Sequence, residues 1–207
     1  MNRFLPAVAG ALFFGVAFLV FFFWYWGSPK FTDVGYRPIQ PVKYSHRLHA
    51  GDLGLDCRYC HSQIEQSRHA NIPPTQTCMN CHKQVGLDNP NLAPVRESWD
   101  TGKPIEWVRV HKLPDYAYFN HAAHLRAGIG CIECHGNVRQ MDIVEQVKPL
   151  SMGWCLDCHR NPDPKIRPIA ELTNMEWTPP PDHAEFVKRF KAERNIKPPE
   201  DCSACHR

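Results

Sequence analysis

Cys57-Arg58-Tyr59-Cys60-His61 is the first of five copies of the pattern C-x-x-C-H in this chain. The other copies begin at Cys78, Cys131, Cys155 and Cys202, and together the five use all ten cysteines of the sequence. This pattern is the attachment signature of c-type haem, in which two thiols bind the vinyl groups of one haem and the adjacent histidine binds its iron. The sequence therefore predicts five covalently bound haem c groups.

The predicted haem-binding residues follow directly from the five motifs. The thioether-forming residues are Cys57, Cys60, Cys78, Cys81, Cys131, Cys134, Cys155, Cys158, Cys202 and Cys205, and the iron-binding motif histidines are His61, His82, His135, His159 and His206. Disulfides or zinc sites are the alternative use of so many cysteines. Disulfides do not require a histidine after each pair, and C-x-x-C zinc sites usually pair two motifs without this regular histidine.

Seven further histidines are candidates for the second axial ligand of the five irons. Four of them form two H-x-x-H pairs, each just ahead of a motif. Histidines three apart on a helix share one face, so one pair can reach two different haems but not both sides of one iron. We expect iron binding by His46, His49, His121, His124 and His111, with His69, Met141, Met152 and His183 as secondary candidates. A thioether ligand from methionine would raise the potential of one haem.

The amino-terminal run predicts a membrane anchor within residues 1–30. Residues 7–26 carry no charge, and about twenty apolar residues span a bilayer as a helix. The alternative is a cleaved signal peptide, whose apolar region is shorter and ends in small residues. This run ends in Trp24, Tyr25 and Trp26, which favours a retained anchor. Arg3 and the site of haem c attachment indicate the bacterial inner membrane, with the amino end in the cytoplasm and the haem-binding part in the periplasm.

The composition predicts that cofactors replace a conventional core. Only 34 of the 177 residues from 31 to 207 are Leu, Ile, Val or Phe, which is a poor supply of core side chains. We expect five haems to provide the missing apolar surface, so the chain without haem should fold badly. No basic run supports nucleic-acid binding in a chain of net charge +3.

The organisation predicted along the chain is an anchor followed by repeated haem units. After residues 1–30 come a di-haem unit at 31–85, a connector at 86–117, a di-haem unit at 118–160, and a proline-rich connector with the fifth haem at 161–207. Short helices are expected at 46–50, 121–127 and 183–194 and just after several motifs, and no strand pattern persists. The predicted fold class is a multihaem cytochrome c, with mostly short α-helices and loops wrapped around five haems and one amino-terminal transmembrane helix.

The residues ahead of the third motif carry a family resemblance. Phe119-Asn120-His121-x-x-His124 resembles small class III multihaem cytochromes, in which the first histidine binds the nearest haem and the second bridges to another. Residues 72–82, 110–116 and 151–159, with one anchor and five motifs, look like the pentahaem subunit of alternative complex III. That resemblance implies an iron–sulfur subunit related to molybdopterin oxidoreductases, multi-span quinol-binding subunits and a mono-haem cytochrome c as partners.

We therefore predict that the chain is an electron-transfer subunit and is not an enzyme by itself. It would relay electrons from the iron–sulfur subunit of a quinol:electron-acceptor oxidoreductase to a periplasmic cytochrome or oxidase. One alternative is a multihaem oxyanion reductase, which needs a haem with an open face, yet all five motifs keep their histidine. The other is a membrane-anchored quinol dehydrogenase, although the apolar span offers little to a quinol head group.

Overall fold

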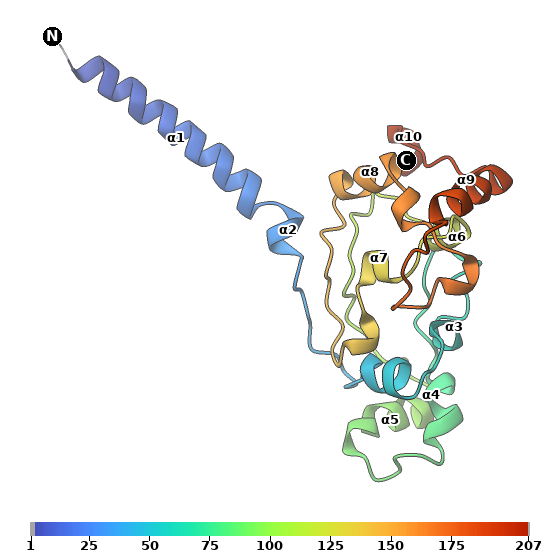
Figure 1. Ribbon diagram of the computed structural model, residues 1–207. Coiled ribbons are helices and arrows are strands. Elements are labelled where there is room, and N and C mark those ends of the chain that lie inside the picture. The colour runs from blue at the N-terminus through green and yellow to red at the C-terminus, as the bar shows by residue number, and fades with distance from the viewer. Residues whose placement is uncertain (1–2, 207) are drawn as a thin grey trace.

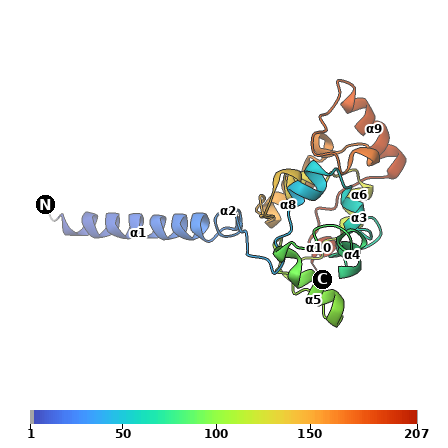
Figure 2. The same cartoon turned by 90° about the horizontal axis from the view of Figure 1, so that it is seen from below.

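A long amino-terminal helix stands clear of the rest of the protein. The computed structural model describes residues 3–206, in which helix α1 (Phe4–Trp26) leads through the short helix α2 (Pro29–Thr32) to a body formed by the remaining chain (Figures 1 and 2). Helix α1 has 23 residues and no buried side chain. At about 1.5 Å per residue it is long enough for the hydrocarbon core of a bilayer, and its composition is apolar enough to cross one.

The body consists of short helices and loops, as expected for the fold class. Its elements are η1 (Arg47–Asp52), α3 (Cys57–Cys60), α4 (Thr75–His82), η2 (Pro90–Leu92), α5 (Ala93–Thr101), α6 (His121–Arg126), α7 (Ile132–His135), η3 (Val138–Gln140), α8 (Met152–Arg160), η4 (Asp163–Lys165), η5 (Ile169–Glu171), α9 (His183–Arg194) and α10 (Cys202–Cys205). Within residues 3–206 there is no strand, only two isolated bridges, Ala117 to His206 and Ile129 to Ile166. With 19 prolines in the chain, long regular elements are rare in the body.

Each C-x-x-C-H motif forms a helical turn of its own. Helices α3, α4, α7, α8 and α10 contain or directly follow the motif cysteines. Helices expected just after the motifs therefore lie on the motifs themselves. The physical reason is that a helical turn brings residues three apart onto one face, as two thiols on one haem require. Side-chain caps start three of these turns: Asp56, Ser151 and Asp201 each accept a backbone N–H.

The other expected helices are found with small changes. Helix α9 has the predicted bounds 183–194, and α6 covers 121–126. The expected helix at 46–50 is instead a π-helical turn, η1, at Arg47–Asp52. The connector 86–117 contains α5, which the sequence pattern did not predict and which ends at Gly102 with φ 70°, a conformation that favours glycine.

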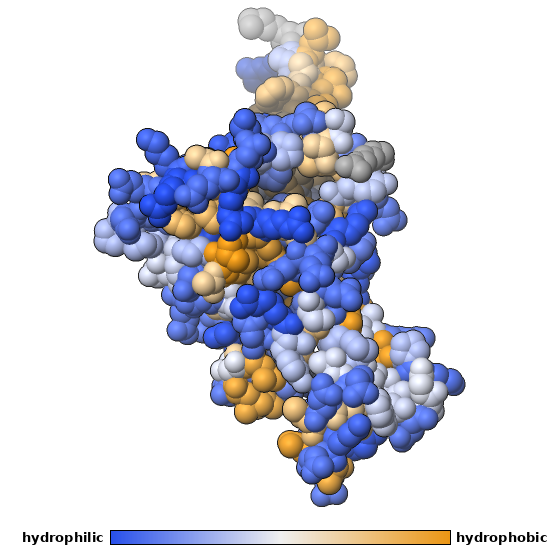
Figure 3. Space-filling model, turned by 90° about the vertical axis from the view of Figure 1, so that its right-hand side faces the viewer, coloured by the Kyte–Doolittle hydropathy of each residue, from blue (hydrophilic) through white to orange (hydrophobic). Residues whose placement is uncertain are grey.

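Conventional cores are small in this body. One cluster joins Val42, Met79 and Val95 where α4 meets α5, and another joins Ile166, Val187 and Phe190 beneath α9. Only eleven hydrophobic side chains are buried in the described part of the chain. Figure 3 shows apolar residues reaching the surface in small patches between hydrophilic ones. Side-chain packing alone is therefore a modest source of stability for a body of this length.

Candidate haem-binding site

Tyr44 organises the first H-x-x-H pair. Its ring stacks on His49, with ring centres 4.4 Å apart, and meets His46 edge-on at 4.8 Å. The carbonyl oxygen of Ser45 accepts the Nδ1–H of His49 at 2.9 Å, and the Ser45 hydroxyl accepts the N–H of Leu48 at 3.0 Å. The Ser45 carbonyl thus orients His49, while His46 packs against the ring of Tyr44.

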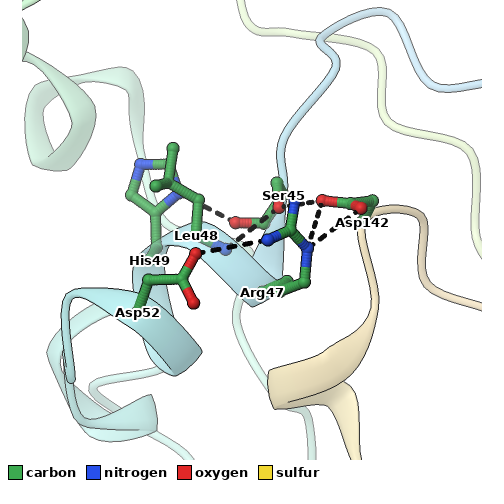
Figure 4. A network of polar contacts seen from close by, with 6 residues as sticks. All are labelled: Ser45, Arg47, Leu48, His49, Asp52 and Asp142. Atoms are coloured by element: carbon green, nitrogen blue, oxygen red, sulfur yellow. Dashed lines mark hydrogen bonds and ion pairs between the residues drawn. The ribbon is translucent and has the colours of Figure 1, made fainter.

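A polar network ties this first unit to a distant part of the chain. The carboxylate of Asp142 accepts hydrogen bonds from the Ser45 hydroxyl at 2.7 Å and from Arg47 Nε at 3.1 Å (Figure 4). These two donors hold the pKa of Asp142 below its usual value. The Arg47 guanidinium also reaches Asp52 at 3.4 Å. The turn bearing His49 is therefore anchored to the segment that follows the third motif.

Phe119 organises the second pair in the same way. Its ring lies against His124 at 4.5 Å and meets His121 edge-on at 4.6 Å. The carbonyl oxygen of Asn120 accepts the Nδ1–H of His124 at 2.8 Å, and its side chain accepts the N–H of Ala123 at 3.2 Å. The internal repeat seen in the sequence is therefore also a repeat of local geometry. Sequence reasoning missed Tyr44 and Phe119 as site residues, although their equivalent places in the repeat were a usable signal.

Most of the predicted iron-binding histidines present the same nitrogen to the protein. Their Nδ1–H groups donate to backbone carbonyl oxygens at 2.6–3.1 Å, which selects the tautomer with a free lone pair on Nε2. Such second contacts orient a metal-binding imidazole and raise its basicity. The residues in this state are His49, His61, His82, His121, His124, His159 and His206.

Three ring pairs have the spacing that a shared iron requires. An imidazole nitrogen lies about 2 Å from a metal that it binds, so two rings on one iron have centres about 6 Å apart. Each such pair joins a motif histidine to one from an H-x-x-H pair. The pairs are His49 with His82 at 6.2 Å, His124 with His159 at 6.0 Å, and His121 with His135 at 6.4 Å.

Burial keeps several of these imidazoles neutral. Desolvation lowers the pKa of His46 and of His111 to about 4 and that of His135 to about 3. A neutral imidazole keeps the lone pair that a metal needs. His111 Nε2 lies 3.3 Å from His135 Nδ1, and the two ring centres are 4.3 Å apart, which is too close for an iron between them.

The secondary candidates lie in different surroundings. His183 donates its Nε2–H to the carbonyl oxygen of Ile166 at 2.7 Å, so that nitrogen is already used. His69 is exposed, Met152 is 66 % exposed, and Met141 is half-buried after η3. No cluster of three or more His, Cys, Asp or Glu side chains converges as a metal site anywhere in residues 3–206.

Buried donors without partners fit a group rich in carboxylates. Five side-chain nitrogens in the described residues are buried without a hydrogen-bond partner, against one oxygen, that of Asn137. Buried polar groups are normally paired, and each haem brings two propionate carboxylates. The unpaired nitrogens are His46 Nδ1, Arg96 Nη1, Arg139 Nε, Gln146 Nε2 and Arg167 Nε. The residues present therefore fit haem, and the sequence pattern had not pointed to this set.

None of the ten cysteines takes part in a disulfide, and two of them from different motifs lie side by side. A hydrogen bond from Cys131 lowers the pKa of the Cys57 thiol to about 7. Burial raises the pKa of Cys134 to about 12. The first and third motifs thus place their thiols side by side, although they are far apart in sequence.

Comparison with known proteins finds relatives among the cytochromes c. The family described as cytochrome c7 and related cytochrome c matches residues 117–207, which contain the last three motifs. Over 176 residues the chain is 30% identical to the multihaem cytochrome c subunit of menaquinone reductase from Nitratidesulfovibrio vulgaris, a match that covers 74% of this chain and 81% of the relative. Covalently bound haem c and a role in electron transfer follow from this kinship. The chain belongs to the multihaem cytochromes c.

Proposed function

We propose that this chain is the pentahaem relay subunit of a membrane complex that exchanges electrons with the quinone pool. The observation that carries the proposal is the approach of H-x-x-H histidines to motif histidines at 6.0–6.4 Å between ring centres. An iron with imidazole on both faces has no open position for a substrate. Such a site passes electrons and does not transform a bound molecule.

The proposed ligand sets follow the repeat. In each unit, the first histidine of H-x-x-H serves the motif just after it and the second serves the next motif. The pairs are His46 with His61, His49 with His82, His121 with His135, and His124 with His159. The charge of His61 lowers the pKa of His46, which supports their closeness.

His69 is the proposed partner of His206 at the fifth motif. Its neighbour Arg68 packs over the ring of Tyr118 at 5.1 Å, and the Tyr118 N–H donates to the carbonyl of Cys205 at 2.8 Å. Residues 68–69 thus lie beside the fifth motif. His111 lies beside His135 of the third motif. It stays the alternative ligand for the fifth iron because the other four irons already have two proposed histidines each.

The chain's own residues give the relay its properties. Haem supplies a one-electron carrier when bound. The backbone carbonyls of Ser45 and Asn120 hold the imidazoles of His49 and His124 in one orientation, so little rearrangement accompanies a change of charge. The partnerless Nε of Arg167 and Nε2 of Gln146, in residues that are 3% and 2% exposed, would donate hydrogen bonds to propionates.

Membrane attachment and partners complete the proposal. Helix α1 would anchor the chain with its amino end in the cytoplasm and its body in the periplasm. The partners would be an iron–sulfur subunit related to molybdopterin oxidoreductases, multi-span subunits with the quinol site, and a mono-haem cytochrome c. Proton removal from a quinol needs a positioned base, and Asp33, beyond α1, is the first acidic residue of the chain. The quinol site would therefore lie on a partner, and this subunit alone would not be an enzyme.

A second candidate function is electron transfer in the opposite direction, toward the quinone pool. The relative from Nitratidesulfovibrio vulgaris is a subunit of menaquinone reductase, which favours electron delivery to menaquinone. Nothing in the bis-histidine arrangement selects a direction, because the same carriers pass electrons either way.

The test compares the purified subunit with the whole complex in mild detergent. In the complex, added menaquinol should reduce the haems, or a reduced electron donor should reduce menaquinone, and the faster of the two reactions identifies the working direction. The isolated subunit should do neither. Rapid, inhibitor-sensitive haem reduction by menaquinol in the subunit alone would overturn the relay proposal and assign the quinol site to this chain.

A further inference from the structure

The second motif lies against the first. Asn80, inside the second motif, donates its side-chain N–H to the hydroxyl of Tyr59, inside the first, at 3.1 Å. His49, which comes just before the first motif, faces His82 of the second at 6.2 Å. These contacts place α4 next to α3.

The first motif also lies against the third. The side chains of Cys57 and Cys131 lie side by side, since each has the largest influence on the pKa of the other. The segment at 172–173 fastens both motifs, because Cys131 donates its N–H to Leu172 at 3.1 Å and Thr173 donates its hydroxyl to Asp56 at 3.0 Å. The first motif is therefore flanked by the second and the third.

The fourth motif bridges the third and the fifth. Lys165, just after α8, pairs with Glu133 of the third motif at 3.2 Å, and His124 faces His159 at 6.0 Å.

On the other side of α8, His159 donates its Nδ1–H to the carbonyl of Pro199 at 2.6 Å. Arg160 pairs with Glu200 at 3.2 Å, immediately before the fifth motif. Both contacts place the fifth motif beyond the fourth.

The figures show the same succession as a column. In Figure 1 the motif helices rise from α4 at the bottom through α3, α7 and α8 to α10 at the top. Seen from below in Figure 2, α3, α4 and α10 lie close together, with α8 to one side of them. The two exposed cysteines of the chain, Cys81 and Cys202, belong to the second and fifth motifs, which are its two ends.

We propose that the haems form one file in the spatial order second, first, third, fourth, fifth, and that electrons enter and leave at the second and fifth motifs. The motif cysteines and histidines would hold the haems in this order, and a one-electron carrier at each motif would exchange electrons with its neighbour with no bond made or broken. This inference rests on the proposed relay function, whose partners supply and remove the electrons. It makes the third motif the middle of the path, although the first motif comes earliest in the chain.

The direct measurement is an experimental structure of the complex with its haems. The iron at the first motif should lie between those at the second and the third, the iron nearest to the second should be the first, and the iron nearest to the fifth should be the fourth. An iron at the second motif whose nearest neighbour belongs to the fourth or fifth would overturn the order. This readout does not depend on activity, so the order can hold even if the complex proves to use no quinone.

Removing one haem at a time tests whether electrons pass through the haems in this order. The double variant Cys131→Ser/Cys134→Ser lacks the middle haem, and Cys202→Ser/Cys205→Ser lacks an end haem and is its matched control. After mixing the assembled complex with its electron donor, two haems of the middle variant should be reduced while the two beyond the gap stay oxidised. In the control, all four remaining haems should be reduced if the donor delivers electrons at the second motif. None of them should be reduced rapidly if it delivers electrons at the fifth.

Reduction of all four remaining haems in the middle variant at the wild-type rate would contradict a single file. If that variant fails to assemble, the positions of the irons in the wild-type complex still decide the order.

Discussion

The two H-x-x-H units differ by one hydroxyl group at the aromatic residue that holds them. Tyr44 carries it and forms a hydrogen bond with Cys60, whereas Phe119 has none. Burial raises the pKa of Tyr44, so the hydroxyl stays protonated and can donate. The two units therefore offer the same histidine geometry with a different polarity beside the thioether of one haem.

For Tyr44→Phe we expect a lower midpoint potential at the haem of the first motif, because hydrogen bonds around a haem tune its potential and this donor would be lost. Spectroelectrochemical titration of the complex measures the change. The matched variant Phe119→Tyr adds a hydroxyl to the second unit and should leave the first haem unaffected. Identical titration curves for Tyr44→Phe and the wild type would argue against any tuning by this hydroxyl.

We propose that His124, which precedes the third motif, binds the iron at the fourth motif, and this predicts which haem changes when His124 is replaced. His124→Ala should convert one haem from low-spin to high-spin, and that haem should be the one attached to the fourth motif, since His124 faces His159 at 6.0 Å. Electron paramagnetic resonance of the oxidised complex shows the conversion. His183→Ala is the control and should leave every haem low-spin, because its Nε2 already donates to Ile166. A change confined to the haem of the third motif would refute the bridge.

At the scale of elements, helix α7 is held by a buried ion-pair network. Arg167 is 3% exposed and donates to Glu133 at 2.8 Å, while Lys165 reaches the same carboxylate at 3.2 Å. The Arg167 guanidinium also lies over the ring of Trp177 at 4.7 Å. Breaking a buried pair leaves its partner uncompensated, whereas an exposed pair contributes little.

Glu133→Gln should therefore destabilise the folded protein by about 1.5–3 kcal/mol, the usual range for losing hydrogen bonds to a charged group. Glu200→Gln removes an exposed partner of Arg160 and should cost less than about 1 kcal/mol. Denaturant unfolding followed by the haem absorption band compares the two variants. Equal losses would mean that burial of Arg167 does not depend on its partner.

At the scale of the whole molecule, the small cores imply that haem attachment and folding are one process. The two hydrophobic clusters lie at different places, one at α4 and α5 and one at α9, and the described chain buries few apolar side chains between them. Binding of a group to the folded state alone adds its binding free energy to stability.

Chain produced in cells that cannot attach haem c should therefore lack a cooperative unfolding transition and be cleaved rapidly in the body that follows α1. Circular dichroism during heating and limited proteolysis measure both properties, with the haem-loaded protein as the reference. A cooperative transition in the haem-free chain would show that the polypeptide carries its own core.

The sequence alone determined the chemistry of this protein because that chemistry depends on local spacing. Two cysteines and a histidine within five residues suffice to identify a haem c attachment point, and twenty uncharged residues suffice to identify a candidate span. The helix at 183–194 was predicted with its bounds, since its pattern and its glycine- and proline-free interior are local. The helices predicted just after the motifs lie a few residues earlier, on the motifs themselves. These turns place two cysteines on one face and have no periodic hydrophobic pattern from which they could be predicted.

Tertiary structure decided which motif stands next to which. The contact between Cys57 and Cys131 joins residues far apart in sequence, and no periodicity encodes it. The partnerless donors of Arg167 and Gln146 are likewise visible only after folding, because burial turns an ordinary polar side chain into one that needs a partner. The order of the motifs along the body follows from long-range packing, which local residue preferences do not contain.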